Sequence, residues 1–121
     1  MTETSAPTAR RDLGERTAEF AQNVRHWIKK LPRTTSTIED IKQLVRSSGS
    51  VAANYIEANE ALGKKDFVMR VRIARKEAKE TRYWLELVEC SEGQAVMRKT
   101  LIQEATELLK ILSAIITKSE G

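Results

Sequence analysis

Four pairs of glutamates stand three residues apart along the chain, which places both carboxylates of a pair on one side of a helix. In four-helix bundles such carboxylates can bridge two metal ions, but those sites also require two Glu-x-x-His motifs. The chain has one histidine, His26, and no glutamate stands three residues before it. We therefore expect no metal site and no cofactor. The pairs are Glu57/Glu60, Glu77/Glu80, Glu86/Glu89 and Glu104/Glu107.

The residue combinations needed for covalent catalysis are also missing. With one histidine, neither a Ser–His–Asp set nor a Cys–His set can be assembled, and no glycine-rich phosphate loop is present. Cys90 is the single cysteine, so an internal disulfide is impossible and a reducing cytoplasm fits. No apolar run approaches the ~18 residues of a membrane span. We expect a non-enzymatic cytoplasmic protein with no membrane contact.

The charges favour binding over catalysis. Residues 64–82 contain eight Lys or Arg and three Asp or Glu, whereas the whole chain has a net charge of only +4. A basic helix of this kind could neutralise the phosphates of RNA or DNA. The alternative is a solvated face with pairs four residues apart, and the charge pattern alone favours that alternative. The candidate phosphate-binding residues are Lys65, Arg72, Arg75, Lys76 and Lys79.

The same segment carries apolar residues on a second side. On a helical wheel Met69, Ile73, Trp84 and Leu87 fall together, away from the positions expected to face the core. Apolar side chains grouped on an outer helix face mark interfaces. We interpret these four residues as a subunit contact of a homo-oligomer. The alternative is that this helix is the most buried helix of a single chain.

Hydrophobic residues recur every three or four positions in four stretches, the pattern of amphipathic helices. Gly (5) and Pro (2) are scarce, which also favours helices. We expect an all-α, up-down-up-down antiparallel four-helix bundle over residues 12–118, preceded by a disordered lead-in over residues 1–11. The helices are expected at about 12–31, 36–62, 65–90 and 94–117.

Helix starts are predicted from capping residues. Asp12 is expected to cap the first helix, Ser36 with Glu39 the second, and Asp66 the third. Within the second helix, the predicted core-facing positions contain small residues in their middle, and Gly49 there indicates close helix approach. These positions are Ile38, Ile41, Val45, Ser48, Ala52 and Tyr55.

The segment from Ser47 to Val88 resembles the bacterial four helix bundle protein family, which includes proteins encoded in intervening sequences of 23S ribosomal RNA genes. Three motifs carry the resemblance: Ala53-Asn54-Tyr55-Ile56-Glu57-Ala58, Asp66-Phe67, and Tyr83-Trp84-Leu85-Glu86-Leu87. The family is similar in fold to the accessory protein of diversity-generating retroelements. The resemblance implies a homopentameric barrel with a basic surface and a nucleic-acid role. It supplies no catalytic residue.

Two functions remain open at this point. The first is a nucleic-acid-binding accessory protein that contacts RNA or DNA phosphates through the basic helix. The second is a structural or scaffolding oligomer that binds a partner protein, with the charges serving solubility. The number five for the oligomer comes from the resemblance alone.

Overall fold

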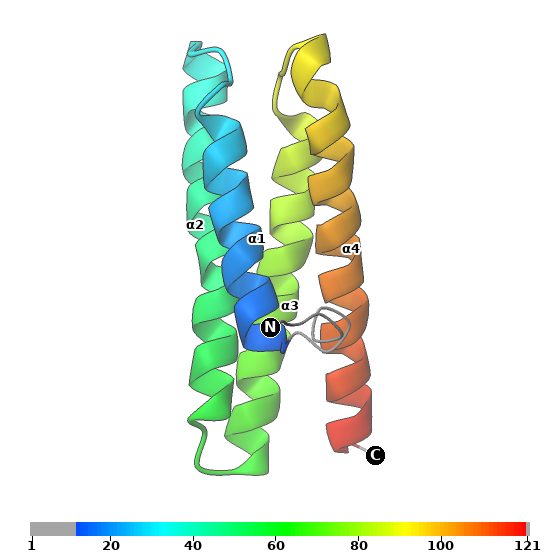
Figure 1. Ribbon diagram of the computed structural model, residues 1–121. Coiled ribbons are helices and arrows are strands. Elements are labelled where there is room, and N and C mark those ends of the chain that lie inside the picture. Colours follow the sequence, from blue (N-terminus) through cyan, green and yellow to red (C-terminus); the bar gives the residue numbers. More distant parts are fainter. Residues whose placement is uncertain (1–11, 121) are drawn as a thin grey trace, which may run out of the picture.

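The computed structural model describes residues 12–120 as four helices joined by short loops. Consecutive helices are antiparallel neighbours, and α4 returns to lie beside α1 (Figure 1). Within the described residues, no Cα atoms of the diagonal helix pairs lie within 8 Å of each other. The predicted all-α, up-down-up-down four-helix bundle is therefore confirmed. The helices are α1 (Leu13–Ile28), α2 (Thr35–Asn59), α3 (Lys64–Leu87) and α4 (Glu92–Glu120).

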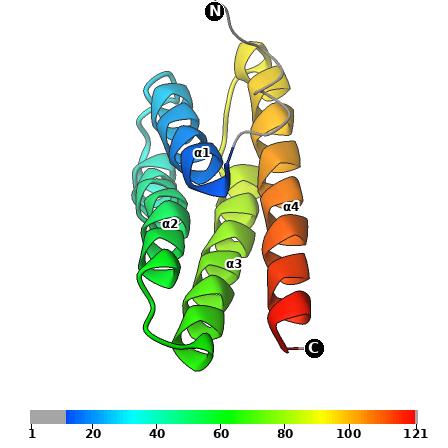
Figure 2. The ribbon, with the colours of Figure 1, turned by 60° about the horizontal axis from the view of Figure 1, so that its bottom comes forward.

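The first helix is much shorter than the others, with 16 residues against 24 to 29. Figures 1 and 2 show that it covers only one end of the bundle, beside the start of α2 and the start of α4. The core correspondingly has two parts. The part at the α1 end is built around Phe20, Leu44, Leu85 and Leu108 from all four helices. The part at the other end contains no fully buried side chain of α1.

Helix starts agree with the sequence for α1 and differ for α2 and α3. The Asp12 carboxylate accepts a hydrogen bond from the backbone N–H of Glu15, as predicted. The cap of α2 is Thr34 instead of Ser36, because Thr34 and Thr37 exchange hydrogen bonds in a reciprocal box. Asp66 was wrongly predicted to cap α3. The cap position is Gly63, which places Asp66 inside the first turn.

The core-facing side of α2 is rotated relative to the prediction. Ile38 is 41% exposed, whereas Leu44, Val51 and Ala58 are buried. These three residues also repeat every seven positions, so α2 has apolar residues on two adjacent sides. Among the predicted positions Ser48 is buried, whereas Ile41, Val45, Ala52 and Tyr55 are only partly buried.

Close packing around the small residues of α2 is confirmed. A side chain at Gly49 would meet the Arg25 guanidinium of α1 at 3.3 Å. On the other flank, the buried Thr81 hydroxyl of α3 donates to the Ser47 hydroxyl at 2.8 Å. No helix within residues 12–120 has the length and apolar content needed to cross a membrane. The predicted lead-in over residues 1–11 lies outside the described residues.

Candidate functional site

The outer face of α3 carries the predicted basic residues. Because α3 buries Val71, Ala78 and Leu85 against its neighbours, the opposite side of the helix faces outward. Four of the five predicted cations are exposed there, while Arg75 is half-buried. We call the exposed residues the α3 basic surface: Lys65, Arg72, Lys76 and Lys79.

Neighbouring acids lie within ion-pair distance of two of these four cations. Arg72 forms an ion pair with Glu120 near the end of α4, and Lys76 lies 3.9 Å from the Glu80 carboxylate. Lys65 and Lys79 make no ion pair with any described residue. Arg75 points to α4, where its guanidinium donates to the Ser113 hydroxyl at 3.4 Å. The structure therefore separates Arg75 from the other four predicted cations.

A hollow of about 530 Å³ lies at one end of the α3 basic surface. It is formed where the first turns of α3 approach the last turn of α4. Its walls combine three cations with one acid and two apolar side chains, so its charge is positive. The lining residues are Lys64, Lys65, Val68, Met69, Arg72 and Glu120.

The four residues of the predicted subunit contact are not equally available. Met69 is 46% and Leu87 51% exposed. Ile73 and Trp84 are partly buried, and Trp84 packs against the core. Tyr83 was not among the predicted contact residues, but its half-exposed ring meets the Trp84 ring edge-on at a centroid distance of 5.0 Å. An outward apolar surface is therefore present on α3, alongside the basic one.

The acids Glu77 and Glu80, which fall among these apolar residues, are held by Arg46 of α2. The Arg46 guanidinium reaches Glu77 at 3.4 Å and Glu80 at 3.1 Å. The Glu77 side chain is only 8% exposed, so Arg46 supplies its compensating charge. The sequence carries no local signal for this link, because the residues are 31 and 34 positions apart.

Asn54, in the family motif, is satisfied locally. Its amide nitrogen donates to the backbone oxygen and hydroxyl of Ser50, and its amide oxygen accepts from Arg70. These contacts support a structural role over a ligand contact. Among residues 12–120, no group of His, Cys, Asp and Glu is arranged to hold a metal ion.

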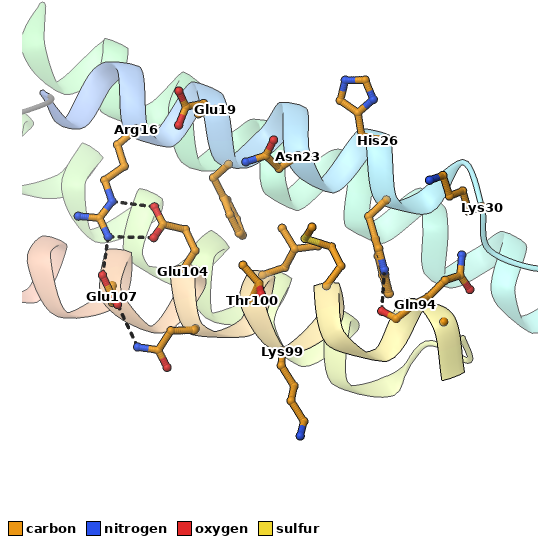
Figure 3. Close-up of a pocket in the computed structure, with 16 residues that line it drawn as sticks. Arg16, Glu19, Asn23, His26, Lys30, Gln94, Lys99, Thr100, Glu104 and Glu107 are labelled. Carbon is orange, nitrogen blue, oxygen red and sulfur yellow. Dashed lines mark hydrogen bonds and ion pairs between the residues drawn. The ribbon is translucent and has the colours of Figure 1, made fainter. Parts of the chain in front are cut away.

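A larger hollow lies elsewhere, between α1 and α4, with a volume of about 1080 Å³ (Figure 3). At one end Arg16 of α1 binds both Glu104 and Glu107 of α4, with N–O distances of 2.6 to 2.8 Å. The hydrogen bond from Arg16 to Glu104 raises the pKa of the guanidinium. Hydrogen bonds from Gln103 and then from Arg16 lower the pKa of the Glu107 carboxyl. Arg16 and Glu107 therefore both carry their charges at neutral pH.

Comparisons with known proteins agree on one family. A family model described as 23S rRNA-intervening sequence protein matches residues 12–114. A solved structure with a TM-score of 0.76 is a protein with unknown function from the S23 ribosomal protein family of Bacteroides thetaiotaomicron. It is 33% identical, and the alignment covers 87% of this chain and 98% of that one. No curated protein matches significantly. Neither description names an enzymatic activity.

Proposed function

Because this chain belongs to the 23S rRNA-intervening sequence protein family, we propose that it is a non-enzymatic, oligomeric accessory protein that binds nucleic acid. The observation that carries the proposal is the α3 basic surface. Four exposed cations project from one helix face, and a positive hollow adjoins them. Such a surface binds the phosphate backbone with little dependence on base sequence. We place the protein in the cytoplasm, where its free Cys90 thiol stays reduced.

Oligomerisation is part of the proposal. The exposed Met69 and Leu87 side chains, with Ile73 and Trp84 beside them, form the subunit contact of a homopentamer. The number five rests on the resemblance described above. A ring repeats the α3 basic surface on each subunit, so a few phosphate contacts per chain combine through a high effective concentration.

The test replaces Lys65, Arg72, Lys76 and Lys79 together by Gln and measures binding of a labelled single-stranded RNA by fluorescence anisotropy. We expect binding to fall at least tenfold, because the phosphate contacts are lost. For the parent, affinity should drop steeply between about 50 and 200 mM salt.

The matched control makes the same charge change on other faces, by replacing the exposed residues Lys29, Lys42, Lys99 and Lys110 with Gln. It should retain most of the binding, and circular dichroism should show unchanged helicity for both variants. If both quadruple variants lose affinity equally, net charge alone drives the binding. If neither does, the α3 basic surface does not bind nucleic acid.

A scaffolding oligomer that binds another protein is the second candidate. The observation that favours it is the partial neutralisation of the basic surface, since Glu120 and Glu80 already occupy Arg72 and Lys76. If the protein is such a scaffold, the exposed ring of Tyr83 would contact the partner protein. The two candidates separate in the salt titration, because binding of a partner protein through apolar contacts should change little with salt.

A further inference from the structure

The groove between α1 and α4 has features of a docking site that the proposed function does not use. Its floor consists of Phe20, Trp27, Met97 and Leu101. Met97 is 47% exposed, whereas the other three side chains lie deep in the floor and are at most 5% exposed. Figure 3 shows that His26 and Lys99 point away from the space between the two helices. Helices α1 and α4 are in less extensive contact than any other pair of neighbouring helices. A long apolar floor with polar rims suits an amphipathic segment.

One buried polar group in the groove lacks a partner. The Gln94 side chain is nine-tenths buried, and its Nε2 makes no hydrogen bond with any described residue. Its amide oxygen is fixed, because it accepts from both the backbone N–H and the hydroxyl of Ser91. The nitrogen consequently points to the α1 side, toward Lys30 (Figure 3). A buried N–H donor without an acceptor destabilises the protein, so a ligand that brings a carbonyl oxygen is favoured.

The two ends of the groove differ in charge. At the end near the start of α1, Glu104 and Glu107 line the groove beside Arg16, and the nearby Lys110 does not line it, so the groove lining there has a negative excess. At the opposite end Lys30 lines the groove near Gln94, and no described acid lines that part. A ligand that fits the groove should therefore carry positive charge at the end with Glu104 and Glu107. At the end with Lys30 and Gln94 it should carry negative charge and a free carbonyl group.

We propose that this groove binds an amphipathic helix of a partner protein, with the helix running parallel to α1. A helix leaves its last four carbonyl groups without internal partners and carries partial negative charge there. In this orientation those carbonyls meet the Gln94 amide and Lys30. The N-terminal turn, with its partial positive charge, meets Glu104 and Glu107. From Arg16 to Lys30 the groove spans about 21 Å, the length of a helix of about 14 residues.

The experiment uses two fluorescein-labelled peptides of about 14 residues with the same apolar face. The forward peptide has lysines in its first turn and glutamates in its last turn, and the reversed peptide exchanges them. The reversed peptide is the better helix in isolation, because its charges suit its own dipole. If the reversed peptide binds more weakly, the difference must therefore come from the charges of the groove, because the helicity of the free peptides would favour the reversed one.

We expect the forward peptide to bind the full chain at least tenfold more tightly than the reversed one, measured by anisotropy at low salt. Gln94→Glu keeps an oxygen for Ser91 but removes the Nε2 donor, so it should weaken forward binding at least tenfold. Gln22→Glu makes the same change on the exposed side of α1 and should have no effect. Met97→Glu should also abolish binding, while the four-Gln variant of the α3 basic surface should bind normally.

Several results would overturn the proposal. These are equal affinity for both peptides, forward binding unaffected by Gln94→Glu, and no binding up to about 1 mM peptide. A photoreactive side chain at position 97 gives an independent check in the absence of peptide. If it cross-links to a second copy of the chain or to residues 1–11, the groove is filled by the protein itself and the proposal is wrong.

Discussion

Replacing Met69 and Leu87 together by Glu should separate the subunits without unfolding them. The two residues are 18 positions apart, which is five helical turns at about 3.6 residues per turn, so they point the same way. They lie about 27 Å from each other along α3. A contact that spans this length would be interrupted at both ends by the introduced carboxylates, each of which loses solvation in the interface.

The cost to the single chain is small. Full burial of a Met or Leu side chain contributes about 1.5 to 3 kcal/mol. Since Met69 is 46% and Leu87 51% exposed, each substitution removes at most roughly half of that from the folded chain. The thermal midpoint should therefore fall by less than about 12 °C. Leu85→Glu, at a site with no exposure, should abolish folding because it buries a charge.

Light scattering after size exclusion measures the mass, and circular dichroism measures the helicity and the thermal midpoint. The matched control places Glu at Leu62 and Val96, which are also exposed but lie off the outer face of α3. We expect the control to keep the oligomer mass of the parent. A parent that is monomeric at micromolar concentration would refute the subunit contact, and a double variant that keeps the parent's mass would refute its location.

Three further predictions concern stability. Leu108→Ala should lower the free energy of unfolding by about 2 to 5 kcal/mol in urea titrations, because Leu108 is fully buried where helices meet; no measurable loss would contradict the described core. Thr34→Ala should cost about 1 kcal/mol while Ser36→Ala costs almost nothing, and the reverse order would show that Ser36 is the true cap of α2. Glu107→Gln should flatten the loss of stability on acidification. The folded carboxyl has a pKa below its ordinary 4.5, so its contribution is present above that value and disappears as the pH falls through the lower one. Urea midpoints at about pH 7 and pH 3 check this, and parallel pH profiles for parent and variant would contradict it.

The core of α3 was predictable from the sequence, but that of α2 was not. In α3 the apolar residues Val71, Ala78 and Leu85 follow one helical pattern, and no second apolar pattern lies directly beside it. In α2 the predicted set that includes Ile38 and Val45 lies beside the buried set that includes Leu44 and Val51. Both sets have helical spacing, so only the placement of α1 and α3 decides between them.

The candidate sites show a similar division. The exposure of Lys65 and Lys79 follows from the pattern of one helix, and the sequence was sufficient to predict it. Pairing of Arg46 with Glu77 depends on the register between α2 and α3, for which the sequence carries no local signal. The α1–α4 groove is even less accessible to sequence reasoning, since Arg16 and Glu104 are 88 positions apart.

The order of helices around the bundle makes the two proposed surfaces independent. Helix α3 stands diagonally opposite α1, so the outer face of α3 points away from the α1–α4 groove. Substitutions in the α3 basic surface should therefore leave peptide binding in the groove unchanged, and substitutions at Gln94 or Met97 should leave RNA binding unchanged. Helix α4 borders both surfaces, and its residue Glu120 forms an ion pair with Arg72 of the α3 basic surface. A change at the groove that broke this ion pair would free Arg72 to bind a phosphate. Glu120→Gln should then raise affinity for RNA, since it frees a cation. If it also left peptide affinity unchanged, the two sites would act separately.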